Sequence, residues 1–344
     1  MFLRIIVLCK LSNILGILDE INPFKEDFYL INMGPKFLKS FIFKRPLSVS
    51  LFITNKCNSK CTFCNIWKEK SKVELNPKDL AKILSKSKLL KNVEQFNLTG
   101  GELFLNSNLI KIVDLLVKYA NPLKISLATN GLSPQIPQIV DELVRKYGNK
   151  KIRFKVSLDT LDKNKYKKIR GVDGYEIIRK NIDYLIKKGL DVSIGFTVND
   201  ENYYELDKIK KTFGSRVIAH PVEDIKYYNS TSKTSKTLPK MTHKKMIFKI
   251  YYLFLFKALK RKRKIHNCYA GEISLCINQN LDVFSCIKNP GQFGNLKDYN
   301  YDFDKLWKTK IQDIRRHVKN CYSGCYCTGD TIPSIGRNPS WMFR

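Results

Sequence analysis

The chain has 344 residues, of which 43% are hydrophobic, and carries a formal net charge of +31 from 62 basic and 31 acidic residues. This length and composition exclude an intrinsically disordered protein, because the chain can bury a full hydrophobic core in one large and one small domain or in two ordinary ones. The basic residues are spread along nearly every predicted helix, which favours a general compositional bias over a dedicated nucleic-acid-binding face.

The ten cysteines are clustered, with three at positions 57 to 64, six at positions 268 to 327, and Cys9 alone. In a chain this long, clusters indicate metal sites and not a disulfide framework. Residues 1–10 are apolar, but Arg4 interrupts them and no small-residue cleavage site follows. We expect a helical N-terminal extension over residues 1–47 and a cytoplasmic, reduced protein.

The first cysteine group is C-x3-C-x2-C at Cys57, Cys61 and Cys64, directly after a predicted strand at 49–54. A structural zinc site takes four ligands, whereas an iron-sulfur cluster of four irons takes one thiolate per iron. Three thiolates therefore leave one iron open to a small-molecule ligand. Zinc modules and chance also produce short cysteine clusters, so the rest of the chain must decide.

From residue 48 to 222, short β-branched runs alternate with helical stretches, which is typical of parallel βα units. The predicted strands are 49–54, 94–98, 123–128, 152–158, 191–198 and 217–219. Six units are too few for an eight-stranded barrel. The predicted fold class is α/β, a partial (β/α)6 TIM-like barrel with a small cysteine-rich C-terminal domain.

Ligand chemistry in such folds gathers at the carboxyl ends of the strands. The second strand runs into Gly100, Gly101 and Glu102, where glycines let backbone approach a ligand and the carboxylate can accept from an ammonium group. The fourth strand ends with Ser157 and Asp159 on one face. Each of these, and Thr129-Asn130-Gly131 after the third strand, also fits an ordinary turn or helix cap.

Taken in order, the cysteine motif with an aromatic residue before its last cysteine, Gly-Gly-Glu and Ser-x-Asp resemble the radical S-adenosylmethionine (SAM) superfamily. The resemblance implies a SAM-binding [4Fe-4S] cluster, with cysteine ligands Cys57, Cys61 and Cys64. It also implies that SAM itself is bound, its amino group by Gly100, Gly101 and Glu102 and its ribose by Ser157 and Asp159. Arg170 is within reach of the SAM carboxylate in this picture, but we expect a solvated arginine.

Residues 223–265 are predicted to be a linker and a basic helix. The polar stretch 229–240 is the best domain boundary, and an apolar run at 247–256 then leads into the basic run 257–264. The apolar run is too short to span a bilayer. Contact of 246–264 with a membrane surface is one interpretation. We favour a buried helix ending in solvated lysines, because Lys and Arg suit a helix C-terminus.

The second cysteine group needs a fold to gather it, and a hairpin pairing 273–277 with 282–286 would bring Cys268 and Cys286 closer together. This arrangement resembles the SPASM or twitch extensions that carry auxiliary clusters in radical SAM enzymes. It implies a second [4Fe-4S] cluster, with ligands Cys268, Cys286 and two of Cys321, Cys325 and Cys327.

Two departures from that pattern leave the exact ligands open. Leu281 stands where the family usually has glycine, and the last three cysteines are spaced C-x3-C-x-C. We expect Cys276 to be a small buried residue. A zinc site or unligated thiols remain the alternative.

We therefore predict a radical SAM enzyme that cleaves SAM reductively and abstracts hydrogen from an unidentified peptide, protein or small molecule. Its electron donor would be a ferredoxin or flavodoxin. The alternatives are a basic, zinc-binding protein that docks on nucleic acid, which we favour less, and a membrane-associated radical SAM enzyme acting on a lipid. The predicted domains are an extension (1–47), the barrel (48–222), the linker and basic helix (223–265) and the auxiliary iron-sulfur domain (266–344).

Overall fold

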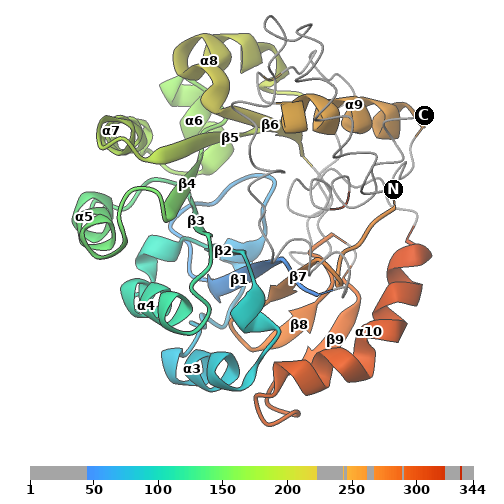
Figure 1. Cartoon of the computed structure of the whole chain (residues 1–344). Helices are drawn as coiled ribbons and strands as arrows, with labels where there is room; N and C mark the ends of the chain where they lie inside the picture. The colour runs from blue at the N-terminus through green and yellow to red at the C-terminus, as the bar shows by residue number, and fades with distance from the viewer. Residues whose placement is uncertain are drawn as a thin grey trace, which may run out of the picture.

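The computed structural model describes residues 45–222, 246–261, 267–288 and 290–321, together with His243 and Ser334. Residues 1–44 of the expected N-terminal extension, the 229–240 stretch, Cys9, Cys325 and Cys327 lie outside the described residues. In Figure 1, a curved sheet carries a row of helices on its outer side, which is the layering of a partial barrel. The predicted fold class is thus confirmed.

All six predicted strands of the barrel are present, and they pair in parallel in chain order. Their bounds are β1 Ser48–Thr54, β2 Gln95–Gly100, β3 Lys124–Thr129, β4 Ile152–Ser157, β5 Asp191–Val198 and β6 Val217–Pro221. The connecting helices are α3 Pro77–Lys86, α4 Leu109–Tyr119, α5 Ile136–Tyr147, α6 Lys163–Arg170, α7 Tyr175–Lys187 and α8 Leu206–Phe213. Short 3-10 helices lie at Ile66–Lys68, Leu90–Asn92, Leu103–Leu105, Tyr203–Glu205 and Gly214–Arg216.

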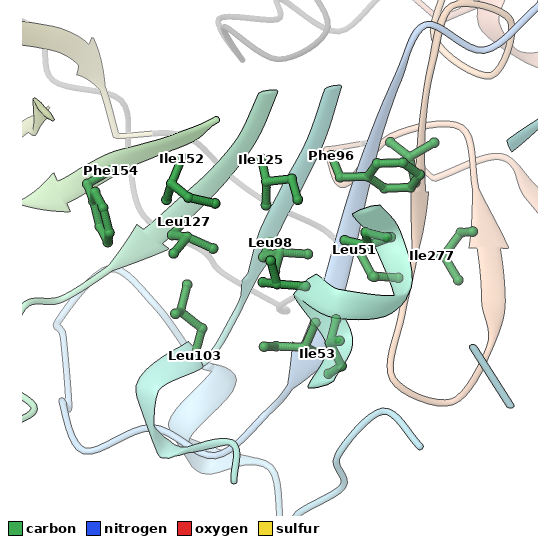
Figure 2. Close-up of a cluster of buried hydrophobic side chains, with 14 of the residues drawn as sticks. Leu51, Ile53, Phe96, Leu98, Leu103, Ile125, Leu127, Ile152, Phe154 and Ile277 are labelled. Atoms are coloured by element: carbon green, nitrogen blue, oxygen red, sulfur yellow. The ribbon is translucent and has the colours of Figure 1, made fainter. Parts of the chain in front are cut away.

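The two faces of the barrel sheet differ in chemistry. On the helix side, Leu51, Leu98 and Leu127 are at most 1% exposed and form the packed cluster of Figure 2. The opposite, inner face carries partly exposed polar residues at alternating positions, for example Ser126 and Ser157. Parallel strands are usually apolar on both faces because both are buried. A polar inner face is therefore unusual and is available to bind ligands.

The C-terminal cysteine-rich segment continues the barrel sheet. Strand β7 (Ser274–Ile277) pairs in parallel with β1, and β8 (Asp282–Phe284) and β9 (Gln292–Asn295) follow antiparallel. Figure 2 accordingly shows Ile277 beside Leu51. The predicted hairpin is confirmed, whereas the domain boundary at residue 266 remains a prediction.

Leu281 occupies the turn of that hairpin with a φ of 72°. A left-handed backbone costs an L-residue roughly 1–2 kcal/mol, a cost that glycine avoids. This explains physically why glycine is the expected residue here. Leu281 is 2% exposed, so burial of its side chain offsets part of that cost.

Helix α10 (Phe303–Lys319) ties the C-terminal segment to the barrel. The Asp304 carboxylate accepts hydrogen bonds from the Ser87 hydroxyl at 2.5 Å and from the Lys88 and Leu89 N–H groups at 2.9 and 3.2 Å. At the other side, the Trp307 indole N–H donates to the Gly271 carbonyl at 3.2 Å. These bonds fix the second cysteine group relative to the barrel.

Helix α9 (Met246–Arg261) covers the free edge of β6. Its Tyr251, Tyr252 and Leu255 are buried, and the Ala219 N–H donates to the Tyr252 hydroxyl at 3.0 Å. The favoured interpretation of a buried helix therefore holds for these residues. Within the described ranges, no helix combines the length and hydropathy needed to cross a membrane.

Candidate functional site

The cysteine loop begins where β1 ends and is held on one side by the end of β2. The Gly101 N–H donates to the Thr54 carbonyl at 2.8 Å, and the Glu102 N–H donates to the Lys56 carbonyl at 2.7 Å. A Cβ would lie 2.1 Å from the Thr54 oxygen at Gly100 and 2.0 Å from the Lys56 oxygen at Gly101. The glycine pair therefore lets the end of β2 approach the cysteine loop. The sequence analysis predicted instead that these glycines let the backbone approach a ligand.

The other side of the loop is held by the C-terminus of α6. The Lys60 N–H donates to the Arg170 carbonyl at 2.9 Å, and the Thr62 N–H donates to the Ile169 carbonyl at 3.0 Å. Carbonyls at a helix C-terminus lack partners within the helix, so the loop supplies them. The residue between these two donors is Cys61, which is consequently fixed at α6.

Glu102 is a buried anchor between β2 and β3. Its carboxylate accepts hydrogen bonds from the Thr129 hydroxyl at 2.7 Å and from the N–H groups of Asn130 and Phe104 at 2.6 and 3.1 Å. Burial raises the pKa of Glu102, and the bonds from Thr129, Asn130 and Phe104 oppose that rise. The carboxylate is thus engaged within the chain, and its predicted contact with an ammonium group stays a prediction.

Asn130 links Glu102 to the cysteine loop. Its side-chain amide donates to the Asn58 side-chain oxygen Oδ1 at 2.7 Å and to the Ser59 hydroxyl at 3.0 Å, and lies 3.9 Å from the Cys57 sulfur. The sequence marked Thr129-Asn130-Gly131 only as polar or turn residues. Its actual partners are about 70 positions away in sequence, so local pattern could not reveal them.

In the three-cysteine loop, the surroundings of Cys57 and Cys64 disfavour the ionised thiolate form. Burial raises the pKa of Cys57 to about 12, with Cys61, Glu102 and Cys64 raising it further and a hydrogen bond from the Ser59 backbone lowering it. Burial likewise raises the pKa of Cys64. Clustered thiolates of this kind are stabilised by a cationic metal group, and three sulfur donors suit an iron-sulfur cluster. The donor set therefore fits such a cluster.

Arg170 and Asp159 form a buried ion pair beside this loop. They are 5% and 0% exposed, and the guanidinium Nη2 contacts the Asp159 Oδ2. A second nitrogen, Nη1, lies 3.6 Å from the Cys61 sulfur, and the Phe63 ring centroid lies 5.6 Å from the guanidinium carbon. The expectation of a solvated Arg170 was wrong, because a carboxylate and a thiol brought from elsewhere in the chain replace water.

Two buried polar groups next to this pair have no hydrogen-bond acceptor or donor within the described part of the chain. They are Nε of Arg170 and the hydroxyl of Tyr166. Buried polar groups are nearly always hydrogen-bonded, so these atoms fit a polar ligand such as the carboxylate of SAM. Ser157 ends β4 two residues before Asp159 and is partly exposed.

The second cysteine group is only partly described. Cys268, Cys286 and Cys321 are partly exposed, and Cys276 is 5% exposed within β7, as expected for a small buried residue. Among the described residues of either cysteine group, no three Cys, His, Asp or Glu side chains converge as a preformed metal site. The ligands of both clusters therefore remain predictions.

The sequence analysis missed a basic pair on the inner face, Lys155 of β4 and His220 of β6. The Lys155 Cε would lie 3.0 Å from a Cβ placed on Gly195 of the strand between them, so its side chain crosses that glycine. Burial lowers the pKa of His220 to about 3, and Lys155 lowers it further. The alternation of strand residues was the signal, because it puts both on the face of Ser157.

Comparison with known families gives one match along the barrel. Residues 51–213 match the model of the Radical SAM superfamily. This range contains the cysteine loop, the Gly-Gly-Glu segment and the Asp159–Arg170 pair.

Among characterised relatives, the chain is 26% identical over 333 residues to the antilisterial bacteriocin subtilosin biosynthesis protein AlbA of Bacillus subtilis. That alignment covers 86% of this chain and 69% of AlbA. A probable GTP 3′,8-cyclase of Methanococcus maripaludis is 34% identical over 172 residues, covering 47% of this chain and 53% of the cyclase. The chain thus spans about half the length of that relative.

Among solved structures, Streptococcus suis SuiB bound to its precursor peptide SuiA is similar in fold, with a TM-score of 0.58. The match covers 87% of this chain and 74% of SuiB at 16% identity. The likeness extends beyond the barrel, since the match covers 87% of the chain and residues 48–222 are only about half of it.

Proposed function

Because the chain belongs to the radical SAM superfamily of enzymes, we propose that it cleaves SAM reductively and abstracts hydrogen from a peptide or protein substrate. The observation that carries this proposal is the three-thiol loop, fixed on both sides and backed by a buried arginine with an unsatisfied donor. Such a site offers metal ligands and a polar cofactor contact together.

Cys57, Cys61 and Cys64 would hold the SAM-binding [4Fe-4S] cluster. With SAM bound, that cluster supplies one electron, which yields methionine and a 5′-deoxyadenosyl radical able to remove hydrogen from a substrate. The protein contributes position and shielding. Hydrogen bonds from Asn130 to the loop, and from the loop to the end of α6, hold the cysteines against the carboxyl ends of β1 to β3.

SAM would bind across the carboxyl ends of β2 and β4. We assign its amino group to Gly100, Gly101 and Glu102, where backbone carbonyls can accept from the ammonium group, since the Glu102 carboxylate already accepts three hydrogen bonds within the chain. We assign the ribose of SAM to Ser157 and Asp159. Ser157 is partly exposed, whereas Asp159 is buried. The carboxylate of SAM suits Arg170, whose Nε has no acceptor among the described residues.

A peptide or protein substrate is supported by how far the relatives extend along the chain. The AlbA alignment covers 86% of the chain and so cannot omit Cys268 and Cys286, whereas the cyclase alignment covers 47%. AlbA is named for the biosynthesis of a bacteriocin, and SuiB was solved with a precursor peptide. The cyclase alignment, which would favour a nucleotide substrate, covers less than half of the chain.

We also propose an auxiliary [4Fe-4S] cluster, held by Cys268, Cys286 and two of Cys321, Cys325 and Cys327. Its support is that Cys268 and Cys286 flank the β7–β8 hairpin, while α10 delivers Cys321 to the same segment. A ferredoxin or flavodoxin would donate the electron for SAM cleavage.

Metal analysis tests the proposal against the zinc-binding alternative. After anaerobic purification and reconstitution, we expect iron and acid-labile sulfide at about eight of each per chain if both clusters fill. SAM and dithionite should then yield 5′-deoxyadenosine. Zinc without iron, or iron without 5′-deoxyadenosine, would refute the enzyme proposal.

A further inference from the structure

Arg170 touches the cysteine loop directly, and not only the place proposed for SAM. Its Nη1 lies 3.6 Å from the Cys61 sulfur, within hydrogen-bonding distance for a sulfur acceptor. The side chain is 5% exposed and the Cys61 side chain is also buried, so water screens their interaction weakly.

Two side-chain contacts and one backbone hydrogen bond hold Arg170 in this position. Asp159 pairs with Nη2 and the Phe63 ring lies under the guanidinium, while the backbone carbonyl of Arg170 accepts the Lys60 N–H at 2.9 Å and so fixes the main chain beside the loop. Asp159 is itself oriented by the Thr197 N–H, which donates to its Oδ1 at 2.8 Å. The positive end of the pair therefore faces the sulfur and the negative end faces β5.

We propose that Arg170 raises the reduction potential of the cluster held by Cys57, Cys61 and Cys64, and that Asp159 limits that increase. Hydrogen bonds to ligand sulfurs and nearby charge are among the factors that set the potential of an iron-sulfur cluster. Reduction adds one negative charge, so a buried cation stabilises the reduced state and a buried anion destabilises it. Arg170 is in this role a positioning residue that acts through Cys61.

The inference rests on the proposed function, because it requires a cluster on Cys61. It predicts that substitutions of Arg170 and of Asp159 shift the midpoint potential of the cluster in opposite directions. Arg170→Gln should lower the midpoint potential by about 59 mV or more, the one-electron equivalent of a tenfold change in the reduction equilibrium. Asp159→Asn should raise it, and Arg170→Lys, which keeps the charge without the fork geometry, should fall between Arg170→Gln and the wild type.

The test is a redox titration of the reconstituted full-length protein, monitored by electron paramagnetic resonance without SAM. The variant with alanine at Cys57, Cys61 and Cys64 is titrated in parallel, so that signal from a second cluster can be subtracted. Lys60→Gln is the matched control, because it removes a charge from the residue next to Cys61 but from an exposed side chain. Its potential should equal that of the wild type.

An unchanged potential in Arg170→Gln, or shifts of equal sign in Arg170→Gln and Asp159→Asn, would overturn the inference. In that case, weaker SAM binding by Arg170→Gln would mean that the arginine serves the SAM carboxylate alone. A wild-type protein with no signal from the first cysteine group would instead refute the proposed function, and this inference with it.

Discussion

At the scale of single residues, the site is built from buried charged groups whose partners come from distant parts of the chain. Glu102 joins β2 to the end of β3, and Arg170 joins α6 to the cysteine loop and to Asp159. Leaving either partner of a buried, hydrogen-bonded charge without the other is strongly destabilising. These residues consequently fix the geometry of the loop before any cofactor binds.

His220 gives a prediction about pH. Burial, and next the Lys155 charge, hold its pKa at about 3, below the ordinary value of 6.5. Between those two pH values the unfolded chain binds a proton that the folded chain does not, so stability falls as the pH is lowered from 6.5 toward 3. The slope is about 1.4 kcal/mol per pH unit at most.

Histidine-ring NMR of the cluster-free protein checks this, with His220→Gln identifying the signal. We expect the His220 resonance to stay that of a neutral ring down to pH 5, and Lys155→Met to raise its pKa. A wild-type midpoint near 6.5 would show that neither burial nor Lys155 acts as described.

The residue scale also shows what sequence could predict. Cys57, Cys61 and Cys64 were predictable because their spacing is local and chemically restrictive. The burial of Arg170 was not, because its partners Asp159 and Cys61 are 11 and 109 positions away. A helix of eight residues with Lys163, Lys165, Lys167 and Lys168 nearby gives every local indication of a solvated surface.

At the scale of elements, the contact between the β2 end and the cysteine loop depends on glycine. At Gly101, a Cβ would lie 2.0 Å from a backbone oxygen, which cannot move away as a side chain can. Gly101→Ala should destabilise the protein by about 1–3 kcal/mol and displace the loop. We expect it to lose iron from the first cysteine group.

Gly148→Ala is the control for this substitution. It strains a backbone with a φ of 75° but meets no atom within 4 Å, so it should retain iron. Iron content per chain, measured after reconstitution, compares the two variants. Full iron in Gly101→Ala would show that the loop does not need the close contact.

The docking of α10 gives a second prediction at this scale. Asp304→Ala removes the acceptor for three hydrogen bonds from the 87–89 segment, at a cost of roughly 1–3 kcal/mol. Hydrogen exchange should accelerate at 87–89 and in the first turn of α10. Asp313→Ala, which loses an exposed ion pair with Arg316, should leave both unchanged. Equal exchange in the two variants would contradict the proposed anchoring.

The strands show the limits of sequence pattern for whole elements. All six barrel strands were predictable, since the apolar positions of each, such as Ile125 and Leu127 in β3, alternate or cluster locally. The parallel pairing of β7 with β1 was not, because Leu275 and its neighbour Val49 are more than 200 positions apart. Local sequence identified the hairpin but contained no information about the edge it would join.

For the whole molecule, the sheet of nine strands in the described part of the chain places Cys268 and Cys286, which flank β7 and β8, on the β1 side of the barrel, next to the strand that leads into the first group. Two clusters on adjoining strands would allow the first to generate the radical and the second to serve the substrate side.

The most direct test of this account replaces Cys57, Cys61 and Cys64 together with alanine in the full-length protein. After reconstitution, the variant should form no 5′-deoxyadenosine from SAM and dithionite, while keeping the iron of the second group, about half of the wild-type content. Sustained 5′-deoxyadenosine formation by that variant would contradict the central claim that these three cysteines hold the cluster that cleaves SAM.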